Sequence, residues 1–138
     1  MVNHPIHPML VHFPIAFLIT ASAGDMAQLV GAWSDSQSVA WAMAAGVVTA
    51  LIAMVAGMVD LAKLNGAAQR IAGFHIAAIG LSWIAYCIAL YLRLEVFTAS
   101  GHPPLASIIS SFFGAAFLMA GGWFGGVMVY RYGAGSSV

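Results

Sequence analysis

Four long apolar runs, separated by short breaks rich in polar residues, glycine and proline, constrain this chain more than any other feature. A helix needs about 20 apolar residues to cross the ~30 Å hydrocarbon core of a bilayer. The runs cover residues 8–30, 39–61, 71–97 and 105–130, so each is long enough. Because short connections join antiparallel neighbours, we predict an all-α, integral-membrane, up-and-down four-helix bundle that forms a single domain over residues 1–138.

The composition indicates the same environment. Of the residues, 62% are hydrophobic and 6% are charged, whereas soluble domains carry about 25% charged residues. The formal net charge is zero, which leaves no basic patch for nucleic acid. No internal repeat is evident. The lipid bilayer is therefore the first predicted partner.

The distribution of Lys and Arg near the helix ends predicts the orientation. Lys63, Arg70 and Arg131 fall on the side that carries both termini, and Arg93 falls toward the other side. This bias predicts a multi-pass protein with both termini in the cytoplasm.

Polar residues from distant parts of the sequence are predicted to share one layer near that face. His12 lies about one turn inside the first span and His75 about one turn inside the third, while Asp60 lies near the end of the second. Tyr130 and Arg131 close the fourth span. Polar groups within a membrane are costly, so this layer should face the interior of the bundle.

Helical periodicity predicts which face of each span points inward. In the third span, one face carries His75, Ser82, Tyr86 and Arg93. In the second, one small-residue face carries Gly46, Ala50, Ala53, Gly57 and Asp60. Asp25 lies deep in the first span, and an ion pair with Arg93 is its simplest interpretation.

The histidines near the predicted cytoplasmic face have two interpretations. His12 precedes Pro14, and it either ligates a metal or hydrogen-bonds the backbone that this proline loosens. His75 is either a ligand or a hydrogen-bonded interior histidine. Neutral imidazole binds zinc, copper and haem iron alike. His7 is a further candidate, because an irregular helix start could present either His7 or His12.

The fourth span is rich in glycine around Trp123, in the stretch AGGWFGGVMVY. Gly122 and Gly125 let another group approach the backbone closely. That group is either a neighbouring helix, as in small-xxx-small packing, or a flat ligand.

These motifs together resemble a known family. HPMLVHFPIAF opens the first span, AGMVD closes the second, FHIAAIG lies in the third and GGWFGGVMVYRYGAG closes the fourth. The pattern is similar to the bacterial four-helix membrane family called domain of unknown function 2231, over essentially the whole chain. The resemblance implies a bacterial inner-membrane location but no settled function. Its signature positions correspond to His7, His12, Asp25, Asp60, His75, Gly122, Gly125, Tyr130 and Arg131. Where the family often has Asn one turn after the third-span histidine, this chain has Ile79.

Three functions are compatible with the sequence. The first is a haem b protein for electron transfer, with haem between the first and third spans, a quinone or redox protein as partner, and His12, His75, Gly122, Gly125, Tyr130, Arg131 and Arg70 around the cofactor. The second is a site for a Zn, Cu or Fe ion formed by His12, His75, His7 and Asp60. The third is a non-catalytic assembly subunit of a membrane complex. We also expect the chain to form a homo-oligomer or to be a subunit of a complex. An electron carrier or binding protein is favoured over a stand-alone enzyme.

Overall fold

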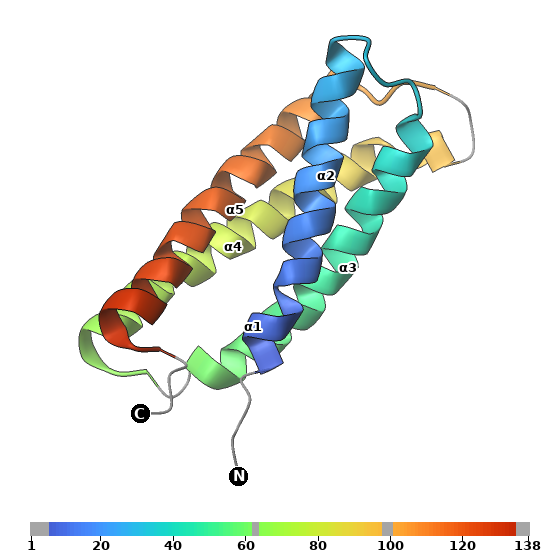
Figure 1. Ribbon diagram of the computed structural model, residues 1–138. Coiled ribbons are helices and arrows are strands. Elements are labelled where there is room, and N and C mark those ends of the chain that lie inside the picture. Colours follow the sequence, from blue (N-terminus) through green and yellow to red (C-terminus); the bar gives the residue numbers. More distant parts are fainter. Residues whose placement is uncertain (1–5, 62–63, 98–100, 135–138) are drawn as a thin grey trace.

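The computed structural model describes residues 6–61, 64–97 and 101–134, and these residues form a bundle of helices without strands (Figure 1). The elements in chain order are α1 (Ile6–Leu10), α2 (His12–Leu29), α3 (Ser36–Leu61), α4 (Gly66–Leu92), the 3₁₀ helix η1 (Leu94–Phe97) and α5 (Leu105–Tyr132). The predicted all-α, four-helix membrane fold is confirmed.

The first predicted span, residues 8–30, is divided at Val11 into α1 and α2. Pro14 has no backbone N–H, so it cannot donate the helical hydrogen bond to the carbonyl of Leu10. The chain still continues in nearly the same direction, because Val11 has helical dihedral angles and its N–H donates to the carbonyl of His7. This break separates His7 on α1 from His12 on α2.

Three helices are long and apolar enough to cross a membrane: residues 36–58 of α3, all of α4 and all of α5. Their mean hydropathies are 2.2, 1.8 and 1.7. The described outer surface is apolar as well, and it includes exposed Trp41, Phe113 and Trp123. An apolar exterior on long helices is what a lipid bilayer requires, so this is a membrane protein.

Local sequence signals set the helix ends a few residues away from the predicted ones. The helix α3 begins at Ser36, because the Asp35 carboxylate accepts hydrogen bonds from the N–H groups of Gln37 and Ser38. The helix α5 continues to Tyr132 and stops at Gly133, whose φ of 66° lies in the left-handed region. The helix α4 begins at Gly66, five residues before its predicted start.

The helices pair as two hairpins, which we call the first hairpin (α1, α2 and α3) and the second hairpin (α4 and α5). Packing is most extensive within each hairpin, and α2 also contacts α5 while α3 contacts α4 (Figure 1). Small residues permit the close approach: Leu18 packs over Gly46 in the first hairpin, and Tyr86 packs over Gly114 in the second. A Cβ at either glycine would lie within 2.7 Å of the side chain above it.

The predicted inward faces are confirmed for the described residues. Ser82, Tyr86 and Arg93 of α4 are buried and His75 is half-buried. Gly46, Ala50, Ala53 and Gly57 of α3 are buried too. The side chain of Asp60 and the whole of Lys63 lie outside the described residues.

Candidate cofactor site

His7 lies on α1 and its imidazole points toward α3. Nδ1 of His7 is 2.8 Å from the backbone carbonyl oxygen of Ala53. The ring lies against Gly57, one turn further along α3, where an added Cβ would come within 2.8 Å of His7 Cε1. The glycine therefore provides the space in which this imidazole lies.

His75 has the same arrangement in the second hairpin. Nδ1 of His75 is 2.8 Å from the backbone carbonyl oxygen of Gly121, and its ring packs against Gly125 on α5. Ile79, which stands where the resembling family often has Asn, packs over Gly121. Ile79 cannot donate or accept a side-chain hydrogen bond, and the backbone carbonyl of Gly121 is the hydrogen-bond partner of His75 instead.

The two hydrogen bonds fix the tautomer of both rings. A carbonyl oxygen only accepts, so Nδ1 carries a proton in each imidazole, and in the neutral ring Nε2 then carries the lone pair. Histidines that ligate a metal commonly have this arrangement: Nδ1–H donates to a backbone carbonyl, and Nε2 has a lone pair that can bind the metal.

The other sequence-predicted residues lie around this pair in different ways. His12 is exposed on the outer side of α2 rather than beside His75. Arg70, Tyr130 and Arg131 are exposed at the end of the bundle nearest the two imidazoles. An added Cβ at Gly122 would meet open space, so within the described residues this glycine is not explained by helix packing.

The sequence did not identify Ala53, Gly57 or Gly121 as parts of this site. Two of them act through a backbone carbonyl, which every residue has, so no side-chain pattern marks them. Gly57 appeared only as a member of a small-residue face. Among the described residues, no group of three or more His, Cys, Asp and Glu side chains is gathered as for a metal ion.

A buried polar network joins the two hairpins in the other half of the bundle. Arg93 donates to both carboxylate oxygens of Asp25, at 2.9 and 3.0 Å, and its Nε donates to Ser107. Ser111 also donates to Asp25. Asp25 and Arg93 are 0% and 1% exposed, so the predicted ion pair is confirmed and is fully enclosed.

The network continues toward the middle of the bundle through Tyr86. Its hydroxyl lies 2.8 Å from Ser22 Oγ and donates to the carbonyl of Leu18 at 3.2 Å. These bonds run between α2 and α4, across the centre of the bundle. They hold the hairpins together in the half that is remote from His7 and His75.

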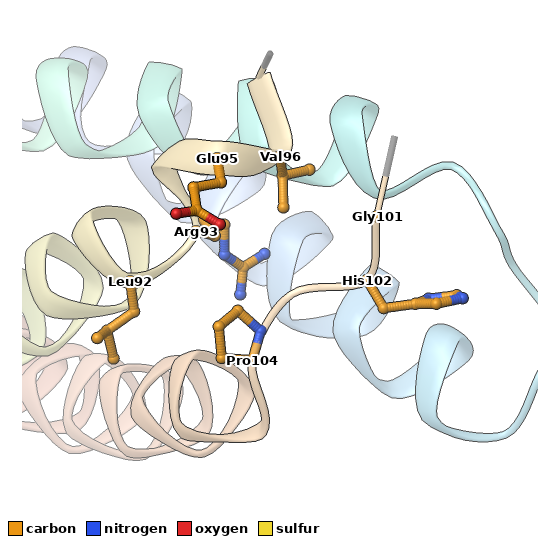
Figure 2. A pocket seen from close by; sticks show the side chains of 7 residues that line it. All are labelled: Leu92, Arg93, Glu95, Val96, Gly101, His102 and Pro104. Carbon is orange, nitrogen blue, oxygen red and sulfur yellow. The ribbon is translucent and has the colours of Figure 1, made fainter. Parts of the chain in front are cut away.

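A cavity of about 130 Å³ lies beside Arg93 at the same remote end (Figure 2). It is lined by Leu92, Arg93, Glu95, Val96, Gly101, His102 and Pro104. The His102 ring extends away from the guanidinium (Figure 2). Because Arg93 is already bound to Asp25 and Ser107, this end serves hairpin packing rather than offering a free cation.

Comparison with known proteins gives one finding. A family described as "Predicted membrane protein (DUF2231)" matches residues 3–137. No curated protein and no solved structure matches the chain.

Proposed function

We propose that this chain, which belongs to the DUF2231 family of predicted membrane proteins, binds haem b between His7 and His75 and carries electrons within a lipid bilayer. One observation carries the proposal: each hairpin has an imidazole whose Nδ1 lies 2.8 Å from a backbone carbonyl oxygen, which leaves Nε2 of the neutral ring with a lone pair for a metal. Imidazole is a common axial ligand of haem iron. Bound haem would supply a one-electron redox centre.

Two histidines provide enough protein ligands for haem iron but too few for a metal ion without a porphyrin. The porphyrin provides four nitrogen ligands, so the protein needs to add two, and His7 and His75 are two. A zinc, copper or iron ion without a porphyrin requires one or two further protein ligands to complete its coordination. Asp60 is the sequence-predicted candidate for that role, and its side chain lies outside the described residues.

Exposed polar groups at the same end suit the haem propionates. Arg70 precedes His75 by five residues on α4, which is a rise of about 7.5 Å along the helix. Arg131 and Tyr130 follow Gly125 on α5 by a similar distance and are exposed. Arginine pairs well with carboxylates, so these residues are the proposed partners of the propionates near the membrane surface.

The proposed orientation has both termini in the cytoplasm of a bacterial inner membrane. It is supported by exposed Arg70 and Arg131 at that end, whereas Arg93 is buried and neutralised by Asp25. A haem near this face would exchange electrons with a quinone or with a redox protein. A second subunit is a further candidate partner, because the outer face of α4 carries small residues such as Gly73, where an added Cβ would contact none of the described residues.

The absorption spectrum of the purified full-length protein tests the proposal. The protein should be expressed with a haem precursor supplied, extracted in mild detergent and measured before and after dithionite reduction. We expect a Soret band that shifts on reduction and one haem per chain. A colourless protein with stoichiometric zinc, copper or iron by elemental analysis would support the bare-ion site instead. A protein with neither haem nor metal would contradict both, and a structural subunit would then be the better proposal.

Substituting Gly57 tests how the His7 ring is held. The Cβ of Gly57→Ala would come within 2.8 Å of His7 Cε1, so the imidazole has to rotate or shift away. We expect haem affinity to fall about tenfold, in line with the effect of other changes that misorient a ligating histidine. Titration of the haem-free protein with hemin measures this.

Two further glycines calibrate that result. Gly125→Ala would place its Cβ 3.5 Å from His75, an ordinary contact, so its effect should be smaller than that of Gly57→Ala. Gly73→Ala faces open space on the outer side of α4 and should leave the affinity unchanged. Equal losses in Gly57→Ala and Gly73→Ala would show that the His7 ring is not constrained in the way described.

A further inference from the structure

The two hairpins repeat each other at a separation of 68 residues. His7 and His75 are 68 positions apart, and each one bonds a carbonyl that lies 46 residues later in the chain. The glycine under each ring then follows that carbonyl by four positions, as Gly57 and Gly125. Two unrelated hairpins would have no reason to share both spacings.

The packing between helices repeats at the same separation. Leu18 lies over Gly46 and Tyr86 lies over Gly114, and both members of the second pair are 68 positions beyond those of the first. Buried residues coincide as well: Leu18 with Tyr86, Ala21 with Ala89, Val39 with Ser107, Ala40 with Ile108 and Met43 with Ser111.

The helix bounds follow the same rule. Moved by 68 positions, the bounds of α3 become 104 and 129, against 105 and 132 for α5. The end of α2 at Leu29 becomes residue 97, where η1 ends. The side chains at equivalent positions differ in chemistry, as Leu18 and Tyr86 do, which explains why no repeat is evident in the sequence.

Asp25 and Arg93 are also equivalent positions, and they bond to each other. An element that contacts its own equivalent lies on the symmetry axis. Because the hairpins run in the same direction, the axis runs along the bundle. We infer that the protein consists of two equivalent hairpins related by a pseudo-two-fold axis that passes through the Asp25–Arg93 pair, with His7 and His75 at equivalent positions on either side of it.

This arrangement gives different roles to two pairs of equivalent residues, His7 with His75 and Asp25 with Arg93. The histidines are alike, so a ligand between them is met by the same imidazole chemistry from either side. The ion pair is unlike, so it distinguishes the two hairpins. Two copies of the same hairpin would bring two carboxylates or two guanidinium groups together in a buried place, and like charges there are strongly unfavourable. The ion pair therefore specifies that the first hairpin docks against the second.

Exchanging equivalent residues between the hairpins tests the inference without any cofactor. The charge exchange is Asp25→Arg with Arg93→Asp. The neighbour exchange moves the surrounding side chains to their equivalents: Val39→Ser, Ser107→Val, Met43→Ser and Ser111→Met. The full-length variants are purified in detergent, and the unfolding midpoint is followed by the fluorescence of the four tryptophans.

The inference predicts that the neighbour exchange has opposite effects on the unfolding midpoint in the wild type and in the charge-exchanged protein. In the wild type it should lower the midpoint, because Arg93 and Asp25 lose the hydroxyls of Ser107 and Ser111. In the charge-exchanged protein it should raise the midpoint, because the hydroxyls introduced at positions 39 and 43 would then stand where the exchanged charges need them. The combined variant should fold, and its unfolding midpoint should lie within about 5 °C of that of the wild type.

Two results would overturn the repeat. One is a neighbour exchange that lowers the midpoint in both backgrounds, because positions 39 and 43 would then not be equivalent to 107 and 111. The other is a combined variant that does not fold. A combined variant that folds when the charge exchange alone does not would support the inference. Since haem plays no part in this measurement, the outcome is independent of the proposed function.

Discussion

The single substitutions His7→Ala and His75→Ala should each remove the haem absorption spectrum. In the proposed site, either change would leave the haem iron with one protein ligand, because it removes the hydrogen-bonded imidazole of one hairpin. Because even indirect supports of a ligand contribute about 10- to 100-fold in affinity, loss of the ligand itself should weaken haem binding by more than about 100-fold. The measurements are the Soret absorbance per chain and a hemin titration of the haem-free variants.

Two other histidines provide the comparison. His102→Ala alters an exposed residue at the remote end and should leave the spectrum unchanged. His12→Ala should also retain haem, since His12 is exposed on the outer side of α2. If His12→Ala removed the haem and His7→Ala did not, His12 would be the ligand of the first hairpin. An unchanged spectrum in both His7→Ala and His75→Ala would rule out the proposed site.

Replacing Asp25 by alanine should have the largest effect on stability. The change leaves the Arg93 guanidinium enclosed without its counter-charge, and Ser111 loses its carboxylate acceptor. Breaking a buried ion pair by removing one partner costs about 3–5 kcal/mol. We expect a reduction of that order in the free energy of unfolding, measured by denaturant titration in detergent micelles.

Two variants separate the lost charge from other causes. Asp35→Asn changes an exposed carboxylate at the start of α3, and asparagine caps a helix as well as aspartate does, so stability should be nearly unchanged. Replacing both partners, as Asp25→Leu with Arg93→Met, leaves no buried charge and should be less damaging than Asp25→Ala alone. A double variant less stable than Asp25→Ala would contradict this account of the network.

Much of the fold could be predicted because a bilayer leaves few alternatives. A long apolar run in lipid has to be a helix, and a charge deep in such a run has to find an opposite charge. Asp25 and Arg93 lie deep in different spans, so their pairing followed from the sequence. The break at Val11 was not placed, although Pro14 indicated an irregular first turn.

The choice between His7 and His12 shows where the sequence argument ended. Five residues on a helix correspond to about 140° of rotation, so the two side chains cannot face the same neighbour. Their depth in the membrane could be estimated from the hydrophobic run. The face that each one occupies depends on how α1 and α2 dock on α3, and that docking places His7 beside Ala53 and Gly57.

The sequence by itself determined the membrane environment, the order of the helices, the inward face of α4 and the Asp25–Arg93 pair, because each follows from the cost of polar groups in lipid. Only the tertiary structure decided that His7 lies against Ala53 and Gly57 while His12 is exposed. It also revealed the carbonyls that hold both rings and the two-fold relation between the hairpins. Backbone carbonyls leave no trace in a sequence, and the equivalent positions carry different side chains, as Leu18 and Tyr86 do above Gly46 and Gly114.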